Sequence, residues 1–112
     1  METLFTKIIE RKIPADIVYE DDLCLAFRDV KPQAPIHILI IPKKPLPKIA
    51  DATQADQQLL GHLFLTANRI AADLGIADAY RLVVNNGADA GQTVFHLHIH
   101  MLAGRSFNWP PG

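Results

Sequence analysis

Cysteine is almost absent from this sequence, and so is any imbalance of charge. The single Cys24 among 112 residues excludes an internal disulfide, so packing must hold the fold, and this usage is typical of a reducing compartment. The formal net charge of −1 gives no reason to expect a nucleic-acid partner, because such binding rests on many Lys and Arg contacts to phosphates. A small phosphorylated ligand remains compatible with that balance.

Long hydrophobic runs are also missing. The sequence has no stretch of about 18 uncharged apolar residues, the length that a membrane-spanning helix needs. The first dozen residues lack the apolar segment and the small-residue cleavage site of a secretion signal. With 49% hydrophobic and 21% charged residues, the composition is globular. We therefore expect one domain over residues 1–112, located in the cytoplasm, with neither a membrane nor a nucleic acid as partner.

The spacing of apolar residues predicts an α+β fold. It predicts a short N-terminal helix over 3–12, capped by Thr3, and a long amphipathic helix over 54–74 that ends at Gly75. Alternating and β-branched runs predict five strands, at 17–19, 23–29, 36–41, 80–85 and 93–102. The first two should form a hairpin, and short connections favour antiparallel pairing throughout. The expected architecture is an antiparallel sheet of about five strands with one long helix on one face.

The last predicted strand carries three histidines in alternation, His96, His98 and His100. Because successive side chains point to opposite faces of a strand, the three share one face. The other face is apolar and should pack against the long helix through Phe95, Leu97, Ile99 and Met101. Three imidazoles in one row, each near its charge equilibrium at neutral pH, indicate a functional site rather than packing.

Two kinds of chemistry use such a row. Histidines at positions i and i+2 can chelate zinc, but the outer pair would be about 13 Å apart along the strand, and Cys24 or His37 would have to complete the set. In phosphoryl transfer, one neutral imidazole is the nucleophile while its neighbours donate protons and hydrogen bonds. A row also contacts an extended phosphate group along its length. We therefore favour phosphoryl transfer and predict no metal and no cofactor.

Residues 96–102, His-Leu-His-Ile-His-Met-Leu, resemble the His-φ-His-φ-His-φφ signature of the histidine triad (HIT) superfamily, where φ is apolar. The resemblance covers practically the whole chain and points to the Hint branch in the segments 7–9, 13–15, 19–22, 26–30, 32–37, 41–44, 85–87, 91–93 and 109–112. It implies a HIT-like fold, a homodimer whose two sheets join edge to edge, and hydrolysis of purine nucleoside phosphoramidates such as AMP linked to an amine or lysine. One departure is Pro45, where many Hint-branch members carry a further histidine.

The resemblance also implies catalytic roles. His98 resembles the nucleophile, with its Nδ1–H held by the backbone carbonyl of His96. His100 and His37 resemble the partners that contact phosphate oxygens and relay a proton to the leaving amine. His96 resembles a supporting member of the row, and a packed, hydrogen-bonded side chain with no direct role is the alternative.

Further residues resemble the nucleotide-binding positions. Asp29 is suited to accept both ribose hydroxyls, because a carboxylate offers two oxygens to two adjacent donors; a turn carboxylate is the alternative. An apolar slot for the purine is expected from residues that periodicity alone would place in the core: Leu4, Phe5, Ile8, Phe27 and Val30.

The phosphate is expected to meet amide, hydroxyl and backbone N–H groups from two loops: Asn85, Gly91, Gln92 and Thr93. Gly91 would permit close backbone approach, whereas Asn85 with the following Asn-Gly also suits a plain turn. Trp109 is expected to reach the partner subunit's site and contact the leaving group, and an exposed tail aromatic is the alternative.

Functions of different classes remain open at this point. In the enzyme hypothesis, His98 turns over a phosphoramidate; in the sensor hypothesis, the same pocket binds a nucleotide and hydrolysis is incidental. A dinucleoside polyphosphate hydrolase is the nearest alternative within the family, and a zinc-binding interaction protein is the third class. The intact triad with His37 favours the enzyme, because a mere phosphate clamp would more naturally use Arg or Lys. His62, in the long helix, is interpreted as a surface or packing residue.

Overall fold

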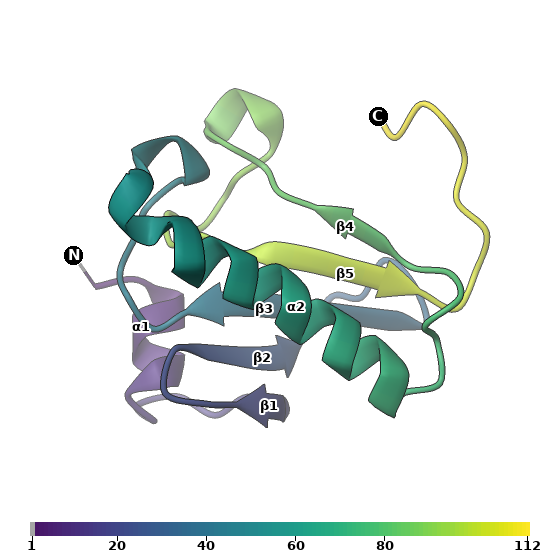
Figure 1. The fold of residues 1–112 in the computed structure, drawn as a ribbon, viewed down its shortest axis with the longest axis horizontal. Coiled ribbons are helices and arrows are strands. Elements are labelled where there is room, and N and C mark those ends of the chain that lie inside the picture. The colour runs from purple at the N-terminus through teal and green to yellow at the C-terminus, as the bar shows by residue number, and fades with distance from the viewer. Residues whose placement is uncertain (1) are drawn as a thin grey trace.

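The structure is a computed structural model that describes residues 2–112, and it has the predicted α+β architecture. One antiparallel sheet has the strand order β1-β2-β3-β5-β4. In chain order the strands are β1 (Ile17–Glu20), β2 (Cys24–Arg28), β3 (Ile36–Pro42), β4 (Arg81–Val83) and β5 (Ile99–Ala103). The helices are α1 (Leu4–Ile9) and α2 (Gln57–Asp73), and α2 lies across one face of the sheet (Figure 1).

The main core lies between α2 and the sheet. The buried stripe of α2 includes Leu63, Ala67 and Ile70, which belong to the same apolar cluster as Ile38 and Met101. The helix begins later than predicted because 54–56 form a 3-10 turn, and it ends as predicted at Gly75, whose φ of +72° suits glycine. Within residues 2–112, no helix combines the length and the apolar character that crossing a bilayer requires.

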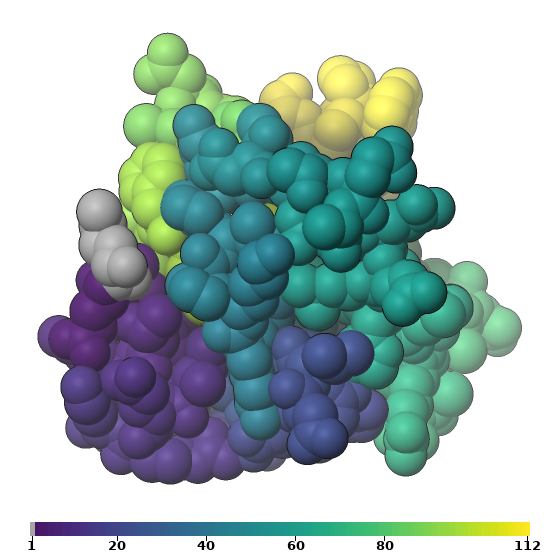
Figure 2. Space-filling model, turned by 60° about the vertical axis from the view of Figure 1, so that its left-hand side comes forward, coloured from purple at the N-terminus to yellow at the C-terminus, as the bar shows by residue number. Residues whose placement is uncertain are grey.

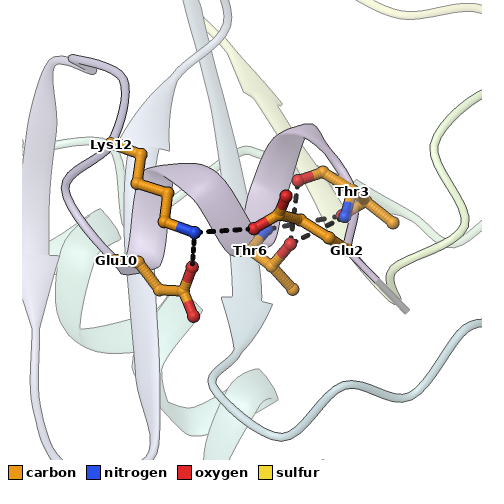
Figure 3. Close-up of polar contacts among 5 residues, drawn as sticks. All are labelled: Glu2, Thr3, Thr6, Glu10 and Lys12. Carbon is orange, nitrogen blue, oxygen red and sulfur yellow. Dashed lines mark hydrogen bonds and ion pairs between the residues drawn. The ribbon is translucent and has the colours of Figure 1, made fainter.

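The helix α1 is shorter than the predicted 3–12 but starts where predicted. The Thr3 hydroxyl accepts a hydrogen bond from the backbone N–H of Phe5. It also accepts one from the Thr6 N–H, and the Thr6 hydroxyl in turn accepts one from the Thr3 N–H (Figure 3). Lys12 pairs with Glu2 near the start and with Glu10 just after the end (Figure 3). A six-residue helix is too short to be stable alone, so these contacts and its packing hold it.

The opposite face of the sheet carries a second, smaller apolar layer. Phe5 and Ile8 of α1 pack there in a cluster with Phe27 and Leu39. The strand β3 is buried on both faces, as its continuous apolar run predicts: Ile38 belongs to the core under α2, whereas Leu39 faces α1. The sheet therefore separates two apolar layers, and the histidines lie in the one beside α1.

The last strand is much shorter than the predicted 93–102, because β5 begins only at Ile99. Pairing with β3 stops there since Pro42 has no N–H to donate, and its carbonyl instead accepts a hydrogen bond from the His96 ring at 2.7 Å. The alternation survives in Leu97, Ile99 and Met101, which reach the core under α2. Phe95 was expected there too, but it is 41% exposed. The strand β4 is likewise shorter than the predicted 80–85.

Candidate active site

A cavity of about 460 Å³ lies beside α1 on the histidine-bearing face of the sheet. Its wall comes from parts of the chain that are far apart in sequence, and Figure 2 shows the N-terminal segment next to the segment that leads into β5. Nine of the residues predicted for the site line this cavity: Leu4, Phe5, Ile8, Phe27, Asp29, Val30, Thr93, His98 and His100.

The His98 ring is held in one tautomer by the backbone. Its Nδ1 lies 2.8 Å from the carbonyl oxygen of His96, and because a carbonyl can only accept, Nδ1 carries the hydrogen and Nε2 keeps a lone pair. The ring packs edge to face with Phe5, with centroids 5.0 Å apart. Burial lowers the pKa of His98, so the ring is neutral at pH 7. A neutral imidazole with a free Nε2 therefore stands at the cavity.

His37 and His100 form a second oriented pair. The backbone N–H of Gln33 donates to Nδ1 of His37 at 3.0 Å, so the hydrogen of a neutral His37 ring lies on Nε2. That Nε2–H can donate to Nδ1 of His100, also 3.0 Å away, which leaves the His100 Nε2–H as a free donor. Burial lowers the pKa of both rings, that of His100 to about 4. Both are therefore neutral at pH 7.

Asp29 follows β2 and combines the two roles considered for it. Its Oδ1 accepts the backbone N–H of Lys31 at 2.8 Å, which is the turn role, while the side chain also lines the cavity. Its Oδ2 lies 3.5 Å from Nε2 of His37, and the negative charge opposes part of the lowering of the His37 pKa. A carboxylate with one oxygen engaged in a turn still has acceptor capacity for a ligand.

His96 does not line this cavity. The residue is 1% exposed, and its Nε2–H donates to the Pro42 carbonyl. This placement corresponds to the packed, hydrogen-bonded alternative, although the backbone carbonyl of the same residue orients His98.

Four of the predicted binding residues do not line the cavity: Asn85, Gly91, Gln92 and Trp109. The Gln92 side chain, expected to meet the phosphate, is buried and donates instead to the carbonyls of Pro47 and Val94, while its oxygen accepts the N–H of Gly87. Gly91 has a φ of +99°, and a Cβ there would lie 3.6 Å from the Asn85 amide nitrogen. Trp109 is 84% exposed in the C-terminal tail.

Other residues that were not predicted for the site also line the cavity: Ile13, Pro14, Ala15, Arg28, Lys31, Leu39 and Val94. Leu39 was detectable, because positions 37 and 39 share one face of a strand and His37 was already assigned to the site. Residues 13–15 form no helix or strand, so periodicity gave no signal for them.

The fold and the cavity define a class of small α+β proteins in which histidines of the sheet line a cavity beside a short N-terminal helix. The chain belongs to the HIT domain family, whose profile matches residues 10–107. It is 68% identical over 111 residues to an uncharacterized HIT-like protein of Synechocystis, covering 99% of this chain and 97% of that protein.

Two solved structures extend the comparison. A HIT family hydrolase from Legionella pneumophila superposes with a TM-score of 0.96 at 46% identity, covering 99% of this chain and 100% of that one. A histidine triad nucleotide-binding protein from Candida albicans gives a TM-score of 0.84 at 27% identity, with coverage of 97% and 83%.

Proposed function

We propose that this protein is a Hint-branch hydrolase that cleaves purine nucleoside phosphoramidates through a nucleotidyl intermediate on His98. The observation that carries the proposal is the tautomer of His98, whose Nδ1–H is engaged by the His96 carbonyl while Nε2 keeps its lone pair beside a cavity. An imidazole prepared in this way is a nucleophile for phosphorus. The similar proteins from Legionella, a HIT family hydrolase, and from Candida, a nucleotide-binding protein, support both halves of the proposal.

The cavity is suited to a nucleoside. Its wall from α1 and β2 is apolar, including Leu4, Ile8 and Phe27, and would take the flat face of a purine. Asp29 stands at the polar side, where it would accept the ribose hydroxyls. The α-phosphate would then lie against His98 and Thr93, which line the same cavity.

The reaction would proceed in two displacements. In the first, Nε2 of His98 bonds to phosphorus, the P–N bond breaks, and the amine leaves as it takes up a proton. His100, which lines the cavity, would contact a phosphate oxygen and give the amine its proton, while His37, which does not line the cavity, would support the relay through its hydrogen bond to Nδ1 of His100. The negative charge of the bound phosphate favours the protonated form of this pair. In the second, water attacks phosphorus and returns a proton to the His100–His37 pair, the P–Nε2 bond breaks and the His98 ring regains its lone pair. The net change is phosphoramidate plus water to nucleoside monophosphate plus amine.

A homodimer is part of this proposal. The C-terminal tail is anchored to the edge strand β4, because Arg81 and Arg105 both stack on Phe107 and Arg81 donates to the Asn108 carbonyl at 2.8 Å. Trp109 projects from this anchor and is 84% exposed. In an edge-to-edge dimer the side chain would be available to the second site, where it would contact the leaving group.

The direct test is detection of the covalent intermediate. After mixing with an AMP-amine conjugate and rapid quenching, intact mass and peptide mapping should show an added nucleotidyl group on His98. His98→Asn should lower turnover by about a thousandfold or more while AMP binding survives. Asp29→Asn should raise KM for the ribonucleotide conjugate but not for its 2′,3′-dideoxy analogue.

The outcomes separate the competing functions. Wild-type turnover no faster than in buffer, with intact nucleotide binding, would leave the sensor hypothesis. Cleavage of a dinucleoside polyphosphate in strong preference to the phosphoramidate would assign the other branch of the family. An adduct that forms equally well in His98→Asn would contradict the proposed nucleophile.

A further inference from the structure

A second cluster of reactive side chains lies away from the nucleotide cavity, where the β1–β2 turn meets α2. It consists of Asp21, Cys24 and His62, whose ligand atoms all lie within 4.8 Å of one another. Asp21 belongs to the turn, Cys24 begins β2, and His62 lies in the second turn of α2. We propose that these three residues form a binding site for Zn²⁺ or a similar late transition-metal ion.

The donor set and its size suit zinc. A thiolate, an imidazole nitrogen and a carboxylate oxygen are the ligands that zinc takes, and water can supply the fourth position. Bond lengths of 2.0–2.3 Å in a tetrahedral site place ligand atoms about 3.3–3.8 Å apart. Here Nε2 of His62 lies 2.7 Å from Oδ2 of Asp21, and no pair of ligand atoms exceeds 4.8 Å. Side-chain shifts of about an ångström would reach tetrahedral spacing.

The surroundings of the cluster already orient two of the ligands. The Asp21 Oδ1 accepts the backbone N–H groups of Leu23 and Cys24, at 2.8 and 2.9 Å. The Tyr19 hydroxyl donates to Oδ2 at 2.8 Å, and the Thr66 hydroxyl lies 3.7 Å from the Cys24 sulfur. None of these bonds has to break when an ion replaces the His62–Asp21 hydrogen bond. Such outer partners raise metal affinity by fixing ligand geometry.

The cluster is open to solvent at His62 and Asp21 but not at Cys24. The side chains of His62 and Asp21 are 33% and 25% exposed, whereas Cys24 is fully buried. Burial raises the pKa of the Cys24 thiol to about 11, so the ion must displace the thiol proton. The step is Cys–SH plus Zn²⁺ to Cys–S–Zn⁺ plus H⁺. The His62 Nε2–H that donates to Asp21 must move its hydrogen to Nδ1 before Nε2 binds the ion. That tautomer change releases no proton, so the thiol proton is the one released per ion.

Cobalt gives the sharpest test, because Cys24 is the only cysteine of the chain. Titration of the purified full chain with Co²⁺ should produce a thiolate-to-cobalt charge-transfer band that saturates at one equivalent and disappears on addition of Zn²⁺. Above pH 7.5, the apparent Kd should tighten about tenfold per pH unit, because one thiol proton is displaced. Zn²⁺ should also raise the Tm of the wild-type protein.

Two variants make the test specific. His62→Gln, at a half-exposed helix position, should fold and keep its hydrolytic activity but lose the band and the Zn²⁺-induced rise in Tm. His100→Gln should keep both, because the other group of potential ligands, Asp29, His37 and His100, contains no thiol. Absence of a saturable band in the wild type, or a band that persists unchanged in His62→Gln, would overturn the proposal, whatever the outcome for phosphoramidate cleavage.

Discussion

The half-buried His100 should make the protein less stable in mild acid. Burial holds the pKa of this ring at about 4, against a reference value of 6.5 in the unfolded chain. Between these values the unfolded state binds a proton that the folded state does not, so the free energy of unfolding falls as the pH falls. From pH 7 to pH 5 the loss from this one group is about 2 kcal/mol, and it is complete only below pH 4.

Replacing His100 by Gln should remove this contribution while keeping a hydrogen-bond acceptor for His37. The measurement is urea unfolding of both proteins at pH 7 and pH 5, at equal protein concentration. The wild type should lose about 2 kcal/mol more than His100→Gln over this interval. Repeating the experiment at higher salt controls for exposed carboxylates, since desolvation is little screened. Equal losses in the two proteins would refute the assignment of an acid-labile, half-buried ring.

Three further predictions concern other parts of the molecule. The rate of phosphoramidate cleavage should fall in acid as His98 takes up a proton, and because burial lowers the pKa of that ring, the acid limb of the pH–rate profile should lie below pH 6.5. Gly104→Ala should destabilise the protein by about 2 kcal/mol, since φ is +93° and the new Cβ would lie 2.8 Å from Pro35. As a control, Gly61→Ala in α2 places a Cβ with nothing within 4 Å and should stabilise the protein by up to about 1 kcal/mol. Thermal unfolding measures both changes. Thr3→Ala should cost about 1 kcal/mol by removing the cap of α1, measured the same way.

Local patterns in the sequence predicted the type and order of the helices and strands but not all of their bounds. The apolar stripe of α2 and the glycine that follows it predicted the long helix. The alternation of apolar residues in 97–101 predicted which of these side chains face the core under α2. The histidines and Asp29 were predicted for the site because of their residue types, and Asp29, His98 and His100 do line the cavity. The apolar wall was assigned through the family resemblance, since periodicity alone would have placed Phe5 and Ile8 in a core, and they do belong to one.

Contacts between distant parts of the chain were not predictable in this way. The start of β5 depends on Pro42, which has no N–H for pairing with that strand. Its carbonyl accepts the hydrogen bond from the His96 ring, and the two residues are 54 positions apart in the sequence. The Gln92 side chain is held by Pro47, 45 residues earlier, so its type alone gave the wrong partner. The pairing of His62 with Asp21 joins positions 41 apart. Each of these contacts is set by the tertiary fold, and the two partners are too far apart to fall within the short segments from which helices and strands are predicted.

The sheet separates the two apolar layers, and this separation affects how substitutions in one layer influence the other. The wall of the cavity beside α1 contains Ile8, whereas the layer under α2 contains Ile70, and the two belong to different clusters. Substitutions such as Ile8→Val and Ile70→Val should therefore be additive to within about 0.5 kcal/mol. Ligand preference can then diverge among relatives through one layer while the other continues to supply most of the stability.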